Sequence, residues 1–195
     1  ADSARVPVPP SSLAELLDWA KKNPGRFTYP KPPEFHGTTF LKQVLIEAGA
    51  DRKALYAPHS AEAFARTTAP LWATLDTLHP ALWKQGTQFL ANTTVMRQML
   101  ADGELAISLT FNPNEAANQI VAKALPASVV SYQHRGGTVG NTHFLAIPFN
   151  ARARQAAQVA ANFLLSPLAQ ARKADIRHWG DPTVLALDKL SAADR

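Results

Sequence analysis

Short segments that favour β-strands alternate along this chain with amphipathic helix patterns, and this alternation constrains the fold more than any other feature. β-branched and aromatic side chains suit a pleated, half-buried surface, so such runs predict strands. The alternation predicts an α/β fold, in which helices pack on a largely parallel sheet. The predicted strands cover residues 26–29, 86–90, 104–110, 128–132 and 142–147.

Composition excludes several classes of protein. The 195 residues can bury one sizeable core or two small ones, and the absence of cysteine excludes disulfide scaffolds, thiol nucleophiles and cysteine-based metal sites. No apolar run reaches membrane-spanning length. The formal net charge is +5, but the basic residues are dispersed and not interleaved with stacking aromatics, so we expect no nucleic-acid partner. The densest basic stretch contains Arg152, Arg154, Arg172, Lys173 and Arg177.

The first ten residues are predicted to form a linker. Residues 6–10 read Val-Pro-Val-Pro-Pro, which excludes helix because proline lacks an N–H and biases its predecessor to extended geometry. The segment has neither an initiator Met nor the cationic and apolar regions of a signal peptide. We therefore expect the chain to begin after processing or truncation.

Helix signals follow at regular intervals. Ser12 and Glu15 form a capping box for a helix that stops at Asn23. A helical stretch over 60–83 is predicted to break at Pro70 and Pro80, with Trp72 in the core. Further helices are predicted over 92–100, 113–124 and from Asn150, with a restart at Ser166.

Two predicted strand-to-helix junctions, at residues 37–39 and 111–114, carry polar side chains. In α/β folds, ligands bind where the carboxyl ends of strands meet the amino ends of helices. Thr38 or Thr39 either caps its helix or leaves first-turn N–H groups for a ligand. Asn112 is predicted to cap its helix with Glu115 as the capping-box partner.

The sequence contains no recognisable catalytic, cofactor-binding or metal-binding motif, so we expect no catalytic residue, cofactor or metal. The nearest approach to a metal motif is His59 with Glu62, which offers only two ligands. Gly136, Gly137 and Gly140 lead into a predicted strand, whereas a phosphate loop opens a helix. Two alternatives stay open.

The first alternative is a small α/β enzyme that uses His36 or His143 as acid or base. It requires a histidine with a hydrogen-bonded carboxylate partner facing a pocket. The second alternative is a basic nucleic-acid module, which predicts strongly salt-dependent DNA binding.

Several motifs occur in a characteristic order. A Gly-Thr-Thr helix start follows a Pro-rich loop within 26–40, and Asp-Gly-Glu-Leu-Ala-Ile-Ser at 102–108 runs into Phe-Asn-Pro-Asn-Glu-Ala at 111–116. Gly-Thr-Val-Gly-Asn at 137–141 precedes the stretches 144–151 and 161–167. Over residues 11–190 this order resembles bacterial extracellular (family 1) solute-binding proteins of ABC importers. Trp-Gly-Asp-Pro at 179–182 is similar to the thiamine-type transport subgroup.

The resemblance implies a type II periplasmic-binding fold, whose two lobes close on a solute about a hinge. It implies that residues 11–127 are the second lobe and that 128–195 are hinge-return strands and C-terminal helices of an incomplete first lobe. The chain then corresponds to the C-terminal portion of an exported, periplasmic protein whose signal peptide lies upstream. Its expected partners are a small-molecule solute and an inner-membrane ABC permease.

The resemblance also implies which residues contact the solute. The set comprises helix-end groups at 37–39, the flat faces of two phenylalanines, the amides of two asparagines, and Tyr132 and Asn141 on the hinge side. A cationic cofactor such as thiamine calls for aromatic faces and acidic neighbours, and the junction segments contain few carboxylates. Iron is not expected, because the three tyrosines, at 29, 56 and 132, include no adjacent pair. The implied solute ligands are Phe35, Gly37, Thr38, Thr39, Phe111, Asn112, Asn114, Tyr132 and Asn141.

The helix predicted from Asn150 has an apolar face that includes Val159, Phe163 and Leu164. The usual partners of this face are absent if the first lobe is incomplete. We expect it to be covered by the absent segment, by self-association with another copy of the chain, or by rearrangement.

Overall fold

Residues 1–57 and 60–194 are described in the computed structural model of this chain. They divide into two compact units: unit 1 comprises residues 1–111 and 125–140, and unit 2 comprises 112–124 and 141–195. The chain therefore passes from one unit to the other after residues 111, 124 and 140. His59, whose pairing with Glu62 was weighed as a metal motif, lies outside the described residues.

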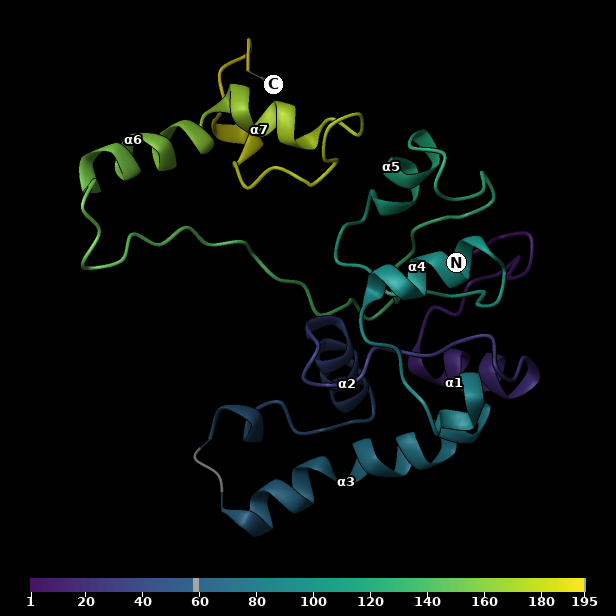
Figure 1. Cartoon of the computed structure of the whole chain (residues 1–195). Helices are drawn as coiled ribbons and strands as arrows, with labels where there is room; N and C mark the ends of the chain where they lie inside the picture. Colours follow the sequence, from purple (N-terminus) through teal and green to yellow (C-terminus); the bar gives the residue numbers. More distant parts are fainter. Residues whose placement is uncertain (58–59, 195) are drawn as a thin grey trace. The chain divides into compact units, whose positions relative to one another are not determined.

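The described residues of unit 1 form four α-helices and three short 3₁₀ turns. Figure 1 labels the helices α1 to α4. Side-chain oxygens of Ser12 and Asn92 accept hydrogen bonds at the starts of α1 and α4, as the capping patterns predict. Ser60 makes the same kind of bond at the start of α3. The elements are α1 (Leu13–Lys22), α2 (Phe35–Glu47), η1 (Ala54–Tyr56), α3 (Ala61–Leu78), η2 (His79–Ala81), η3 (Trp83–Gly86) and α4 (Thr93–Ala101).

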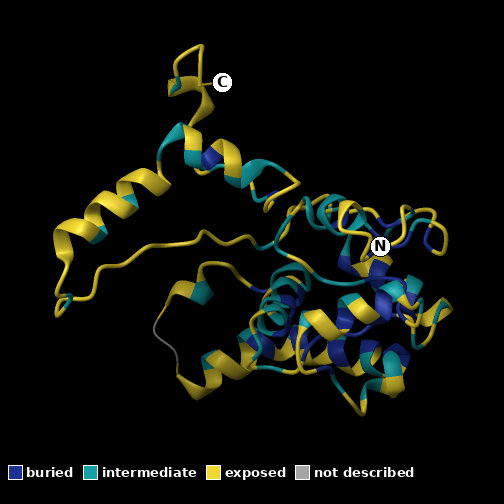
Figure 2. Ribbon diagram, turned by 45° about the horizontal axis from the view of Figure 1, so that its top comes forward, coloured by how far each residue is buried: buried dark blue, intermediate teal, exposed yellow. Residues whose placement is uncertain are grey.

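The core of unit 1 is built on buried extended segments rather than on a regular sheet. Phe27, Leu105 and Ile107 are almost fully buried, and they pack with side chains from α1 to α4 (Figure 2). The described residues form no strand; they contain only two isolated bridges, between Asp2 and Val129 and between Pro30 and Leu90. The predicted strands at 26–29, 86–90, 104–110 and 128–132 therefore appear as extended or irregular segments.

Isolated main-chain hydrogen bonds, rather than a continuous ladder, join these segments. The N–H of Ala106 donates to the carbonyl of Arg26 at 2.8 Å, which is a sheet-like contact. One residue further on, the carbonyl of Phe27 accepts from Trp83, at the start of η3, also at 2.8 Å. A ladder needs successive bonds between the same two segments. The described structure is therefore helix-rich, and the α/β type II layout remains a proposal.

Residues 1–10, predicted as a linker, pack against the rest of unit 1. Val6 is 1% exposed, and Asp2 is also buried. Hydrogen bonds join the main chain of Ala1 to Val130 and that of Ser3 to Ser128, each at 2.8 Å. These contacts tie the first residues to the 125–140 stretch of the same unit.

α3 differs from the prediction at two positions. The predicted break at Pro70 is wrong, because Pro70 lies inside a continuous helix of 18 residues. Buried Leu71, Leu75 and Leu78 hold the turns after Pro70 against the core, which offsets the missing backbone hydrogen bond. Trp72, predicted in the core, is half-exposed, and its indole N–H donates to Thr68 Oγ1 at 3.0 Å.

Unit 2 contains α5 (Glu115–Val121), α6 (Arg154–Leu164), α7 (Pro167–Ala174) and η4 (Leu187–Lys189). Ser166 caps α7 as predicted, whereas α6 starts four residues after Asn150 and has no side-chain cap. α6 has no buried residue, and residues 141–150 are exposed throughout (Figure 2). The predicted strand at 142–147 is an exposed segment without regular secondary structure.

Candidate functional site

The amino end of α2 contains the first group of predicted solute ligands. Glu34 is the N-cap, and its Oε2 accepts a hydrogen bond from the N–H of Gly37 at 2.9 Å. The N–H of Thr38 already donates to the carbonyl of Glu34 at 2.8 Å. The prediction that Thr38 or Thr39 caps the helix is therefore wrong, because a glutamate that reaches the third helical N–H starts the helix earlier.

Gly37 lies where α2 passes closest to the extended segment that ends at Pro30. A Cβ added at position 37 would overlap the carbonyl oxygen of Pro30, and Gly37 itself is buried. Its N–H is bound by Glu34 in this structure. The glycine is therefore required by a close approach of two backbones.

Three rings lie together beside this helix start. The centroid of the Phe111 ring is 4.8 Å from that of Phe35 and 4.9 Å from that of His36. Phe35 is 53% exposed, so part of this ring cluster faces solvent. The structure thereby brings Phe111, the first residue of the predicted junction 111–114, beside residues 35 and 36, which directly precede the predicted junction 37–39. Offset aromatic faces of this kind can stack on a flat group.

Glu34 is also hydrogen-bonded to His36, whose Nδ1 lies 3.0 Å from Glu34 Oε1. Burial by itself raises the pKa of Glu34, but hydrogen bonds from Gly37 and His36 outweigh it, so this pKa lies below its ordinary value. A carboxylate thus stays ionised next to the ring cluster near neutral pH.

A second histidine–carboxylate pair joins α2 to residue 134. His134 Nδ1 lies 2.6 Å from Glu47 Oε1, and the other oxygen of Glu47 accepts from the N–H of Leu13 at 2.8 Å. Burial alone raises the pKa of Glu47, but hydrogen bonds from Gln43, His134 and Leu13 lower it further than burial raises it. Sequence analysis missed this pair because 87 residues separate its members.

The hinge-side residues predicted as ligands lie in different units. Tyr132 belongs to unit 1, where it packs partly buried against the core, and burial raises the pKa of its hydroxyl. Its ring centroid is 6.5 Å from that of His134. Asn141 is exposed and is the first residue of the second stretch of unit 2.

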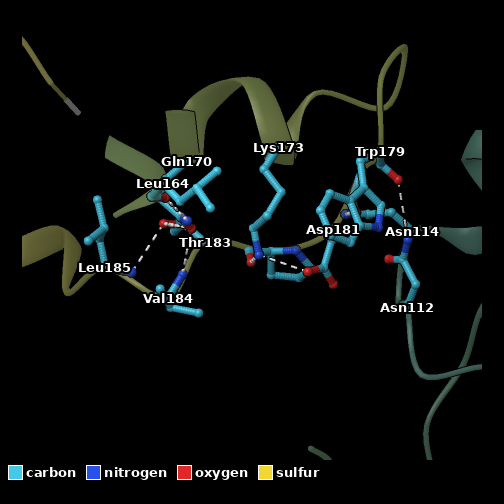
Figure 3. A network of polar contacts seen from close by, with 12 residues as sticks. Asn112, Asn114, Leu164, Gln170, Lys173, Trp179, Asp181, Thr183, Val184 and Leu185 are labelled. Atoms are coloured by element: carbon cyan, nitrogen blue, oxygen red, sulfur yellow. Dashed lines mark hydrogen bonds and ion pairs between the residues drawn. The ribbon is translucent and has the colours of Figure 1, made fainter. Parts of the chain in front are cut away.

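In unit 2, predicted ligands Asn112 and Asn114 bind the turn at Trp179 and Gly180 (Figure 3). Asn114 Nδ2 donates to the carbonyl of Gly180 at 2.7 Å, and Asn112 Nδ2 donates to that of Trp179 at 3.4 Å. Asn118, which sequence analysis did not single out, also donates to the carbonyl of Trp179. Three side-chain amides from one segment therefore hold one turn.

Asn112 also explains where α5 begins. Its Oδ1 accepts from the N–H of Asn114 at 2.9 Å, which is an Asx turn. This local bond competes with helical geometry, so α5 starts at Glu115, two residues later than predicted.

The other side of the same turn is held by Lys173 (Figure 3). Lys173 Nζ donates to Asp181 Oδ2 and to the carbonyl of Pro182, each at 2.7 Å. The ammonium also lies 5.7 Å from the centroid of the Trp179 ring. Residues 179–182, singled out by sequence, thus form a turn fixed from two sides.

Metal-binding clusters and membrane-spanning helices are both absent from the described residues. Within residues 1–57 and 60–194, no three histidine or carboxylate side chains gather as a metal ion would require. None of the helices described there has the length and apolar character needed to cross a membrane.

Comparison with known proteins bears on the whole chain. The family model of bacterial extracellular solute-binding proteins matches residues 1–186. The chain belongs to this family. The chain is 51% identical over 190 residues to Protein YnjB of Escherichia coli (strain K12), a match that covers 97% of this chain and 49% of YnjB. It thus spans about half the length of this curated relative. No solved structure matches it.

Membership of the solute-binding family favours a periplasmic-binding-protein fold and a binding role. The helix-rich structure of the described residues leaves the arrangement of strands in that fold open.

Proposed function

We propose that this chain is a substrate-binding component, or part of one, of an ABC-type importer. It captures a small solute in a cleft between two lobes and delivers it to an inner-membrane permease. The observation that carries the proposal is the family match over residues 1–186, together with the 51% identity to YnjB. As part of the same proposal, the protein is exported to the periplasm by a signal peptide upstream of this chain.

The chain is further proposed to be the C-terminal portion of a longer protein. It covers only 49% of YnjB, and the apolar side chains on α6 are uncovered in the described structure. Val159 is 70% exposed and Phe163 is 57% exposed. Monomers rarely leave contiguous apolar faces exposed. In this proposal residues 1–10 are a linker, 11–127 the second lobe, and 128–195 the elements that complete the first lobe.

The proposed solute is a flat cation of the thiamine type. The rings of Phe35 and Phe111 offer stacking faces, and the ionised carboxylate of Glu34 is hydrogen-bonded to His36, which packs on Phe111. Aromatic faces next to a negative charge suit a cationic heteroaromatic ring. The full set of proposed ligands is Phe35, Gly37, Thr38, Thr39, Phe111, Asn112, Asn114, Tyr132 and Asn141.

Binding is tested on a polypeptide extended upstream to the length of YnjB. Thiamine and a panel of organic solutes are screened by thermal shift, and hits are measured by titration calorimetry. We expect Phe35→Ala to weaken thiamine binding several-fold, up to about 10-fold, because stacking contributes about 0.5–1.5 kcal/mol. The matched control is Phe64→Ala on α3, since Phe64 is 52% exposed and Phe35 is 53% exposed.

Two outcomes of this screen contradict the proposal at different levels. If no organic solute stabilises the extended protein, the transport function is wrong. If another solute binds and Phe35→Ala has the same effect as Phe64→Ala, the function stands but the aromatic site is wrong.

The uncovered face of α6 has its own experiment. Light scattering after size exclusion, with an apolar dye, compares the present chain with the extended protein. We expect the chain to bind dye or to self-associate through α6, and Phe163→Glu to abolish the self-association. A folded monomer of the present chain that binds no dye contradicts the proposal of an incomplete lobe.

The His36–Glu34 pair favours one alternative, a small α/β enzyme that uses a histidine as acid or base. The carboxylate of Glu34 also caps α2, so the pair has a structural role as well. Incubation with the bound solute, followed by mass spectrometry, separates the two functions. A binding protein returns the solute unchanged, whereas an enzyme converts it and loses this conversion in His36→Gln.

A further inference from the structure

The side-chain amide of Gln43, on α2, pairs with the main chain of residues 137–139. Gln43 Oε1 accepts from the N–H of Val139 at 2.6 Å, and Nε2 donates to the carbonyl of Gly137 at 3.1 Å. The amide therefore contacts one backbone donor and one backbone acceptor on either side of Thr138. In a parallel sheet, the N–H and the C=O of one residue on a neighbouring strand make the same pair of bonds.

Glu47 fixes the orientation of this amide. Gln43 Nε2 donates to Glu47 Oε1 at 2.6 Å, and an ionised carboxylate can only accept. If the amide were turned over, its oxygen would face the carboxylate and the Gly137 carbonyl, and its NH₂ would face the Val139 N–H. Glu47 is itself held by the N–H of Leu13 and by His134. The position of the Gln43 amide is therefore set by contacts that involve α1, α2 and residue 134, all in unit 1.

Besides its bonds to Gln43, the segment makes one turn bond, from the N–H of Gly137 to the carbonyl of His134 at 2.9 Å. Gly136, Gly137 and Gly140 fall within five residues, and a Cβ at any of them would meet no atom within 4 Å. Glycine has more conformational freedom in the unfolded or mobile state than other residues, so ordering it costs more entropy. Hydrogen bonds from outside the segment therefore decide how well it is ordered.

Residue 140 is also the last residue of unit 1, and Asn141 follows it. We propose that Gln43 is a positioning residue: its amide fixes the main chain at Gly137–Val139 and so sets the place of Asn141. The effect on solute affinity rests on the proposed solute-binding function, but the ordering of the segment does not. Gln43 itself is not a proposed ligand and acts through the chain that it holds.

Hydrogen exchange on the Gln43→Leu variant tests the ordering directly. Leucine has a similar size but no hydrogen-bonding groups, so we expect the Val139 amide to exchange about 10-fold faster. The matched control is Gln98→Leu. Gln98 lies on α4 and also donates to a carboxylate four residues on, that of Asp102, at 3.0 Å.

Amides of the core separate positioning from a general loss of stability. The exchange of Val44 and Met96, both fully buried, should be the same in Gln43→Leu as in Gln98→Leu. Acceleration confined to residues 137–141 supports the proposal. Equal acceleration of Val44, Met96 and Val139, or no change at Val139, overturns it.

Affinity for thiamine, measured on the extended protein, tests the functional consequence. We expect Gln43→Leu to weaken binding several-fold and Gln98→Leu to leave it unchanged. If the wild-type protein binds no thiamine, the proposed solute is wrong, and hydrogen exchange still decides the role of Gln43. Unchanged affinity in Gln43→Leu overturns the link to Asn141.

Discussion

The carbonyl oxygen of Pro30 occupies the space in which any side chain at position 37 would begin, so only glycine fits between α2 and the extended segment 26–30. This contact sets how closely α2 approaches the core of unit 1. It also places the helix start, and with it Phe35 and His36, next to Phe111. The geometry of the ring cluster thus depends on one residue without a side chain.

Replacing Gly37 with alanine should therefore destabilise unit 1 by about 2–4 kcal/mol, because the overlap is with main chain and cannot be relieved by a rotamer change. Urea unfolding measures this loss. Gly136→Ala is the matched control, since nothing lies within 4 Å of its added Cβ. Equal stability of the two variants would show that α2 and Pro30 are further apart than described.

Replacing Gly180 with alanine should loosen the turn that the three asparagine amides hold. Gly180 has a φ of +73°, and its added Cβ would overlap the side chain of Asn118. Gly25 has a φ of +79° and open space around it, so Gly25→Ala isolates the backbone cost of about 1 kcal/mol. We expect Gly180→Ala to shift the Trp179 indole resonance in NMR spectra, and Gly25→Ala to leave it in place.

Acidification should reduce stability through His79. Burial lowers the pKa of His79, an effect that the nearby Asp76 partly opposes, and the ring is hydrogen-bonded to the Tyr29 hydroxyl at 2.8 Å. The unfolded chain then binds a proton at higher pH than the folded chain does. The stabilisation is present above the ordinary value of 6.5 and is lost as the pH falls below it.

This prediction is checked by urea unfolding of wild type and His79→Gln between pH 5 and pH 8. The slope of unfolding free energy against pH should become shallower in His79→Gln. If His79→Gln keeps the wild-type slope, the loss of stability on acidification comes from a group other than His79.

Glu34 should stabilise α2 only while its carboxyl group is ionised. Its pKa lies below the ordinary value of 4.5, so its contribution is present above that pH and is lost as the pH falls through the lowered pKa. Glu34→Ala removes both the cap and the hydrogen bond to His36. We expect the free energy of unfolding to fall by about 1–2 kcal/mol at pH 7. Glu34→Gln retains an acceptor for Gly37 and should lose less.

Thermal unfolding from pH 7 down to pH 3 tests this assignment. The difference between wild type and Glu34→Ala should shrink as the solution is acidified. A difference that stays constant with pH would mean that the lost stability comes from packing of the side chain rather than from its charge.

Local sequence patterns predicted those helix starts at which the cap side chain accepts a hydrogen bond from an N–H three residues further along the chain. Ser12, Asn92 and Ser166 each cap a helix where the sequence places it. Thr38 was wrong as a cap because Glu34 reaches the same turn from further back, and glutamate is not among the preferred caps. Pro70 was wrong as a break because leucines on the following turns pack into the core.

The candidate site shows the same division between short-range and long-range information. Residues 37–39 and 111–114 could be singled out from junction patterns alone. That Phe35 stacks on Phe111, or that Glu47 pairs with His134, depends on residues tens of positions apart meeting in a packed core. Nothing in the sequence around Asn112 and Asn114 predicts that their amides bind the carbonyls of Trp179 and Gly180.

The sequence by itself determined that the chain is a helix-forming, cysteine-free protein with the motif order of a solute-binding family, because caps, periodicity and motifs are encoded within a few residues. The tertiary structure decided which extended segments lie beside each other, why position 37 is glycine, and what the predicted ligands contact. Those outcomes depend on which backbone donors and acceptors find partners as the core forms, and each donor can satisfy a strand or a turn but not both.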